Sequence, residues 1–68
     1  MEKYFVNNTP QSSGDHEVHK SGCYWLNLAN SVEDLGYHAS CHSAVAKAKL
    51  RYATANGCKT CSFDCHTT

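Results

Sequence analysis

The sequence lacks a net charge, a long apolar run and any internal repeat. Its 68 residues carry six basic and six acidic side chains, so the formal net charge is zero, which is unfavourable for general attraction to phosphate. No stretch approaches the ~20 apolar residues that span a membrane, and the N-terminal residues contain no apolar run of signal-peptide length. These absences predict a cytoplasmic protein with no membrane partner.

The chain is also too short to build a large apolar core. Below roughly 70–80 residues, a core alone seldom stabilises a fold by more than a few kcal/mol, so disulfides, a metal ion or oligomerisation are often needed. This sequence has five cysteines and five histidines. Full pairing of five cysteines leaves one thiol over, and in a reducing compartment closely spaced cysteines more often bind metal. We therefore expect a metal site rather than disulfides.

The apolar pattern predicts one α+β domain over residues 1–68, with short antiparallel strands packed on one C-terminal helix that a cysteine turn follows. Residues 4–6 favour a strand, and residues 16–20 are expected to return as the second strand of a hairpin. The two ends, 1–2 and 66–68, are expected to be flexible.

Two further segments are predicted to lie in the core. Residues 23–28 are the densest apolar stretch and are expected to supply much of the buried surface. Leu35 and Tyr37 belong to a short predicted strand. Because side chains two positions apart share a face of a strand, both are expected to point the same way.

The clearest predicted element is a helix from about Cys41 to Ala55. Ser40 is a suitable N-cap, and Gly57 indicates a stop, since glycine readily takes the left-handed conformation after a helix. Apolar residues recur along one face at helical spacing, namely Cys41, Ala44, Val45, Ala48 and Tyr52. On this pattern Cys41 is a small buried hydrophobe rather than a ligand.

The strongest chemical signal is a pair of half-sites for a metal ion. Cys58 and Cys61 are separated by two residues, a spacing that lets one turn aim both sulfurs at one ion. His19 and Cys23, separated by three residues, supply a second half-site far upstream. Four such donors would complete a tetrahedral site, and mixed cysteine and histidine ligation favours zinc.

Other ligand sets remain open. A four-cysteine site, in which Cys65 replaces His19, is the main competitor, and His66 beside it is a further alternative ligand. Strand alternation places His19 opposite Val18, so His16, which shares the Val18 face, is the reserve candidate. A redox role for the C-x2-C pair is less favoured, because a thioredoxin-type pair precedes a helix and this pair follows one.

The order H-x3-C, Leu-Gly-aromatic strand, Ala/Lys-rich helix and G-C-x2-C over residues 16–61 resembles the N-terminal metal-binding domain of the Ada-type DNA-repair methyl acceptor. The whole chain also resembles a group of short bacterial proteins of zinc-binding type that end in G-C-x2-C-x3-C-H. The resemblance implies a zinc-bearing α+β module held by His19, Cys23, Cys58 and Cys61. The methyl-accepting cysteine of the repair domain corresponds to His19, so that chemistry is not implied.

These observations favour a non-enzymatic structural zinc module, a monomer that acts as an adaptor for an unknown protein partner. Four protein ligands leave no open coordination position for catalysis. One alternative is nucleic-acid binding through a basic helix face, with Lys47, Arg51 and Lys59 as contacts. The other alternative is a redox-sensitive zinc switch that uses an extra cysteine, Cys65 or Cys41.

Overall fold

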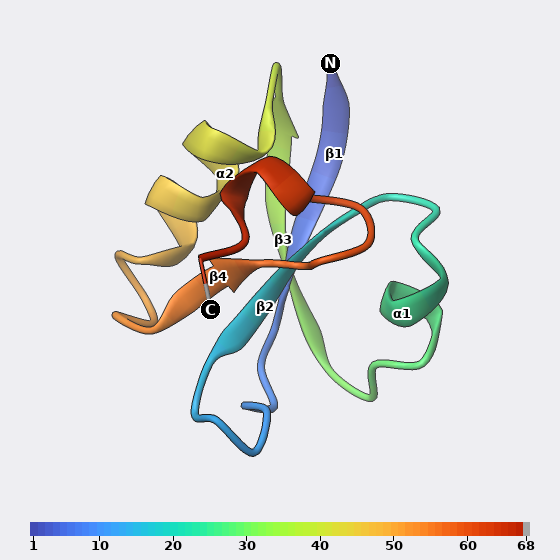
Figure 1. Cartoon of the computed structure of the whole chain (residues 1–68). Coiled ribbons are helices and arrows are strands. Elements are labelled where there is room, and N and C mark those ends of the chain that lie inside the picture. The colour runs from blue at the N-terminus through green and yellow to red at the C-terminus, as the bar shows by residue number, and fades with distance from the viewer. Residues whose placement is uncertain (68) are drawn as a thin grey trace.

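The computed structural model describes residues 1–67, whose strands form one four-stranded mixed sheet (Figure 1). In sheet order the strands are β3 (Val32–His38), β1 (Glu2–Asn7), β2 (His16–Lys20) and β4 (Ala55–Gly57). β1 is antiparallel to both β2 and β3, whereas β4 runs parallel to β2. The predicted α+β class and the predicted hairpin of the first two strands are confirmed.

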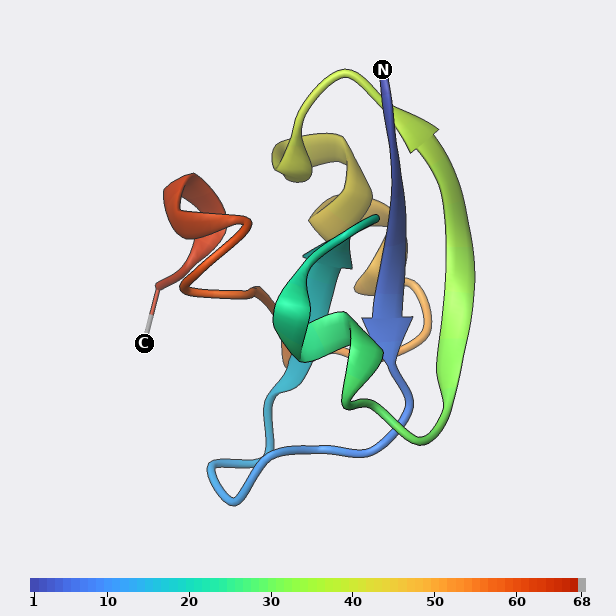
Figure 2. The ribbon, with the colours of Figure 1, turned by 90° about the vertical axis from the view of Figure 1, so that its right-hand side faces the viewer.

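Helix α2 (Cys41–Ala48) packs on one side of this sheet (Figures 1 and 2). Ser40 is its N-cap, as predicted, because its hydroxyl accepts a hydrogen bond from the His42 N–H at 3.3 Å. The core forms between the apolar face of the helix and the inner face of the sheet. Its buried members include Tyr4, Val6, Val18, Leu35, Cys41, Ala44 and Ala48.

The predicted extent of the helix is wrong, because α2 ends at Ala48 and the chain reaches β4 at Ala55 after turns in residues 49–54. β4 pairs with the outer edge of β2, where the Cys58 N–H donates to the Val18 carbonyl at 2.9 Å. Pairing satisfies backbone groups that an unpaired edge would leave open. The apolar periodicity of residues 41–55 indicates a helix and carries no information about the distant β2 edge, so it could not predict β4.

Gly57 is required for close approach and not for a left-handed turn. It lies in β4, and its φ is not positive. A Cβ at this position would lie 2.6 Å from the Ser62 carbonyl oxygen and 2.7 Å from the Cys65 Cβ. The absence of a side chain therefore lets the C-terminal segment pack directly on β4.

The prediction that Leu35 and Tyr37 share a face is also wrong. The pairing of β1 with β3 shifts register between Tyr4 and Phe5, which face Gly36 and Asp34. This bulge breaks the strict alternation of side chains. Leu35 consequently enters the core, with 3% of its surface exposed, while Tyr37 is 65% exposed.

Residues 23–28 supply little of the core, contrary to expectation. Cys23 is buried, but Tyr24, Trp25 and Leu28 around helix α1 (Tyr24–Asn27) are exposed. A four-residue helix is about one turn long, so its side chains radiate in several directions instead of sharing one buried face. Figure 2 shows α1 as a separate turn beside the sheet.

The C-terminal segment folds back on the body of the protein through η1 (Phe63–Cys65), a 3-10 turn. Cys65 at its end forms a disulfide with Cys41 at the start of α2. The expectation of no disulfide, with Cys41 as an unpaired hydrophobe, is therefore wrong. The Thr67 N–H donates to the Asn56 side-chain oxygen at 3.0 Å, while residue 68 of the end predicted to be flexible lies outside the described residues.

Candidate metal centre

The four residues of the two predicted half-sites come together in space. The ligand atoms of His19, Cys23, Cys58 and Cys61 all lie within 4.8 Å of one another. His19 belongs to β2 and Cys23 directly precedes α1, whereas Cys58 and Cys61 follow β4. The cluster therefore ties the first half of the chain to the last, across a sequence separation of 35 residues between Cys23 and Cys58.

Parallel pairing of β2 with β4 explains the arrangement. The register sets Val18 beside Gly57, so the next residues, His19 and Cys58, are carried to the same end of the two strands. The Cys23 N–H donates to the Lys20 carbonyl at 3.1 Å, which turns the chain back after β2. β4 is thus the element that aligns the half-sites, and the sequence pattern did not reveal it.

The spacing of the donors suits a tetrahedral zinc ion. The Sγ atoms of Cys23 and Cys58 are 4.0 Å apart, and the Cys61 Sγ lies 3.9 Å from the His19 Nδ1. Zinc–sulfur bonds of about 2.3 Å and zinc–nitrogen bonds of about 2.0 Å imply edges of roughly 3.5–3.8 Å in a tetrahedron. These two separations exceed the expected edges by a few tenths of an ångström, and all the donor atoms lie within 4.8 Å of one another, so a small inward movement would let the four side chains hold an ion of this size.

His19 is held in an orientation that suits a ligand. Its Nδ1 faces the cluster, while its Nε2 lies 3.5 Å from the Glu17 carboxylate. Burial lowers the pKa of His19 below its ordinary value, and the Glu17 charge only partly opposes this shift. The imidazole is therefore neutral at neutral pH, the form that binds metal.

Glu17 was missed in the sequence analysis, although its position carries a signal. It lies two residues before His19 in a strand and so shares its face. A carboxylate on the outer nitrogen of a metal-ligating histidine fixes the ring and makes it a better donor. This contact is a second feature of a metal site, independent of the four donors.

The cysteine thiols of the cluster are electrostatically unequal. Burial alone would raise the pKa of Cys23, but hydrogen bonds from Cys61 and from backbone N–H groups of α1 lower it. Burial raises the pKa of Cys61 to about 12, although the Lys20 N–H donates to its sulfur at 3.2 Å. Three thiolates so close together repel one another, so a cation is the natural means of ionising all three.

The alternative ligands lie elsewhere. Cys65 is bonded to Cys41. The His16 ring stacks on Tyr52, with ring centroids 3.8 Å apart, and the His66 Nδ1 lies 3.1 Å from the Gly57 carbonyl oxygen. The His16 side chain thus points to the same face of the sheet as Val18, the face covered by α2. Strand alternation points Val18 and His19 to opposite faces of β2. Both side chains are nevertheless buried, because both faces of β2 are covered, so His19 can reach an interior metal site.

The three cations assigned to nucleic-acid binding do not form one helical stripe. Lys47 lies in the last turn of α2, but Arg51 follows the helix and its Nε is 2.7 Å from the Glu33 carboxylate. Lys59 lies between the cysteines that follow β4, beside Trp25 in a cavity of about 280 Å³. The charge available at the helix is therefore smaller than the sequence predicts.

No family model, curated protein or solved structure matches this chain. The likeness to the Ada-type domain therefore stays a prediction. In the part of the chain that the structure describes, α2 is the longest helix at eight residues, and no helix is long and apolar enough to cross a membrane.

Proposed function

We propose that His19, Cys23, Cys58 and Cys61 bind one zinc ion that stabilises the fold. The observation that carries this proposal is the convergence of four donors within 4.8 Å from two distant segments. Zinc would neutralise the thiolates and link β2 to the segment after β4, which gives a small domain the stability that its core cannot supply.

We propose further that the protein is not an enzyme. A site with four protein ligands is closed to water and substrate, unlike catalytic zinc sites, which keep one position open. Glu17 would act by orienting His19, because its contact is with the ring nitrogen on the far side from the cluster. A structural role for the ion agrees with both features.

We propose that the protein is a monomer that acts as an adaptor for a protein partner, and the surface next to this site supports that role. Tyr24, Trp25 and Leu28 are exposed around α1, and aromatic side chains are enriched at protein interfaces. Trp25 is anchored to the metal-binding segment, since its Nε1 donates to the Thr60 hydroxyl at 3.1 Å. A bound ion would hold this aromatic surface in place by fixing Cys23 and the turn that contains Thr60.

Native mass spectrometry of the purified protein, with and without a chelator, tests the zinc proposal. One zinc ion per chain is expected, with loss of circular dichroism signal after its removal. An apo-protein that stays fully folded would contradict a structural role. A protein that takes up no zinc under reducing conditions would contradict the site itself.

One observation favours the redox alternative as a second candidate function. Cys41 and Cys65, the two extra cysteines named for that role, form the disulfide. We propose a cytoplasmic location, and in that reducing compartment such a bond would be open for much of the time. The state of this bond, rather than oxidation of the zinc ligands, would then be the redox-sensitive feature.

A further inference from the structure

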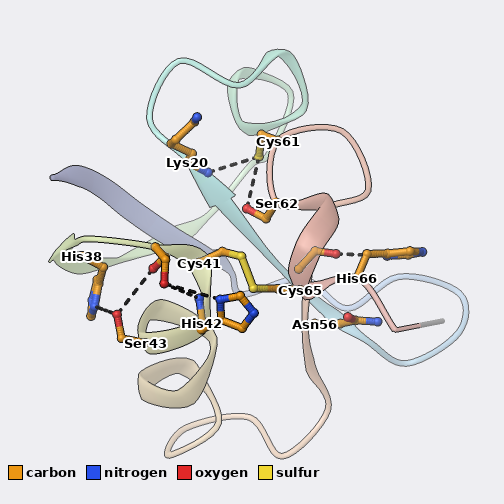
Figure 3. The surroundings of a disulfide bond; sticks show 12 residues. Lys20, His38, Cys41, His42, Ser43, Asn56, Cys61, Ser62, Cys65 and His66 are labelled. Atoms are coloured by element: carbon orange, nitrogen blue, oxygen red, sulfur yellow. Dashed lines mark hydrogen bonds between the residues drawn. A yellow bond between two sulfur atoms is a disulfide. The ribbon is translucent and has the colours of Figure 1, made fainter.

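A second group of metal-binding side chains surrounds the disulfide. The donor atoms of Cys41, His42 and Cys65 lie within 4.8 Å of one another. The two sulfur atoms are bonded in this structure, and Figure 3 shows the His42 ring beside that bond. None of these residues belongs to the four-donor cluster, so the group is separate from the zinc site proposed above.

We propose that reduction of the Cys41–Cys65 disulfide creates a second site for a thiophilic divalent cation of the zinc type. Cys41 and Cys65 would provide two thiolates, and His42 would provide an imidazole nitrogen. Two sulfur donors and one imidazole form a ligand set that zinc accepts. This inference does not depend on occupancy of the first site.

The chemistry requires an external reductant. Two molecules of a small thiol, or one dithiol, supply two electrons and two protons. The Cys41–Cys65 bond breaks to give two protein thiols, and the reductant becomes a disulfide. The cation then binds both sulfur atoms and displaces their two protons to solvent. The intact disulfide has no thiolate to offer, so this site exists only in the reduced protein.

His42 is available as a ligand. Its side chain is exposed, and within residues 1–67 the hydrogen-bond partner of its ring is the Ser40 hydroxyl, 3.5 Å from Nδ1. That distance is at the outer limit of a hydrogen bond. A metal ion could therefore recruit the ring at little cost, by either nitrogen.

The surroundings favour a cation over two free thiols. Both cysteine side chains are buried, at 7% and 8% exposure, and a buried thiolate needs a compensating charge. Cys41 is the first residue of α2, where the positive end of the helix favours its ionised form. These features lower the cost of deprotonating the pair when a cation arrives.

One carboxylate lies in the same region, although it is not part of the three-donor group. Asp64 and His42 both line a cavity of about 320 Å³ that includes Cys41, and both line another of about 200 Å³ that includes Cys65. The Asp64 carboxylate is not among the donor atoms that lie within 4.8 Å of one another, so it would have to move to reach an ion held by Cys41, His42 and Cys65. A carboxylate or a water molecule would complete four-coordination.

Titration with Co²⁺ under anaerobic conditions tests the proposal, because cobalt(II) reports thiolate ligands by its charge-transfer absorption. The disulfide-bonded protein is expected to bind one equivalent and the fully reduced protein two. The second equivalent should show the weaker absorption of two thiolates. Equal stoichiometry in the two redox states would overturn the inference.

Variants separate this inference from the first site. The His42→Ala protein keeps the disulfide and should fold when oxidised, but after reduction its affinity for the second equivalent should fall by at least about tenfold. The Cys58→Ser/Cys61→Ser protein should bind one equivalent only when reduced. If the oxidised wild type binds none while the reduced wild type binds one that His42→Ala weakens, the first site fails and this one stands. An unchanged affinity in His42→Ala would remove His42 from the site.

Discussion

The four-donor cluster and the Cys41–Cys65 pair stand at the two ends of one short segment, residues 58–65, yet they fasten different parts of the molecule. The cluster joins β2 and the start of α1 to the turn after β4. The disulfide joins the start of α2 to η1. The disulfide closes one loop of the chain, and an ion bound at the cluster would close a different one.

The comparison shows how neighbours decide the chemistry of a cysteine. In the cluster, a neutral imidazole and three free thiols share one position, and mutual repulsion of thiolates favours a cation. Around the start of α2, the sulfur atoms of Cys41 and Cys65 lie together without a third cysteine, and they form a disulfide. The odd cysteine count fits this arrangement, because two residues pair and the other three belong to a cluster that could hold a metal ion. A chelator and a reductant should accordingly act on different regions.

The largest effect is expected from removing the zinc ion proposed for the cluster. At a free metal concentration a thousandfold above the dissociation constant, binding contributes about 4 kcal/mol to stability. For a domain of this size that corresponds to a fall in Tm of roughly 15–30 °C on chelation. Calorimetry measures the shift, and Trp25 fluorescence follows it, because the indole contacts Thr60.

The Cys58→Ser variant should show the same low Tm without a chelator. His16→Ala is the matched control, since His16 stacks on Tyr52 outside the cluster, and it should keep one equivalent of metal. Loss of metal from His16→Ala with retention in Cys58→Ser would reverse the assignment of ligands.

A smaller effect is expected from opening the disulfide alone. The bond closes a loop with a sequence separation of 24 residues, for which chain entropy predicts a loss of about 3 kcal/mol. The Cys41→Ser/Cys65→Ser protein, saturated with zinc, should unfold at lower denaturant concentration but retain its four-donor site. A changed metal affinity at that site would show that the two regions are coupled.

The four donors could be predicted because their information is local. His19 and Cys23 are separated by three residues, and Cys58 and Cys61 by two, so the spacing alone identifies half-sites. The hairpin of β1 and β2 is local in the same sense. The two half-sites and this hairpin are therefore determined mostly by residues close together in the sequence.

The disulfide, β4 and the bulge at Leu35 depend on distant parts of the chain. Cys41 fits the apolar face of α2 equally well as a free thiol or in a disulfide. Its partner, Cys65, is known only once η1 is seen to pack against the start of α2. Ala55–Gly57 reads as the end of a helix until the open edge of β2 is known. Such features follow from the assembled sheet and not from sequence periodicity.

Gly57 tests whether the two regions can be separated at all, since it precedes Cys58 and contacts Cys65. An added methyl group would lie within 2.8 Å of three atoms of Ser62 and Cys65, so Gly57→Ala should cost about 1–3 kcal/mol. Gly14→Ala is the control, because its Cβ meets nothing within 4 Å and it carries only the strain of a φ of +92°. Denaturant unfolding of both variants measures the difference. An unchanged unfolding midpoint in Gly57→Ala would show that steric approach at Gly57 is unimportant.

The smallest expected effect is confined to the cluster and concerns Glu17. Its carboxylate lies 3.5 Å from the His19 Nε2, and loss of such an outer contact typically weakens metal binding by about 10–100-fold. Competition with a chromophoric chelator should show this loss for Glu17→Gln, with one equivalent still bound and the Cys41–Cys65 bond unaffected. Glu2→Gln, at the start of β1 and paired with His38 of β3, is the control and should bind zinc as the wild type does. If Glu17→Gln also binds zinc like the wild type, His19 is oriented by packing alone. The two cysteine regions would then differ in the number of their metal donors and not in an outer carboxylate contact.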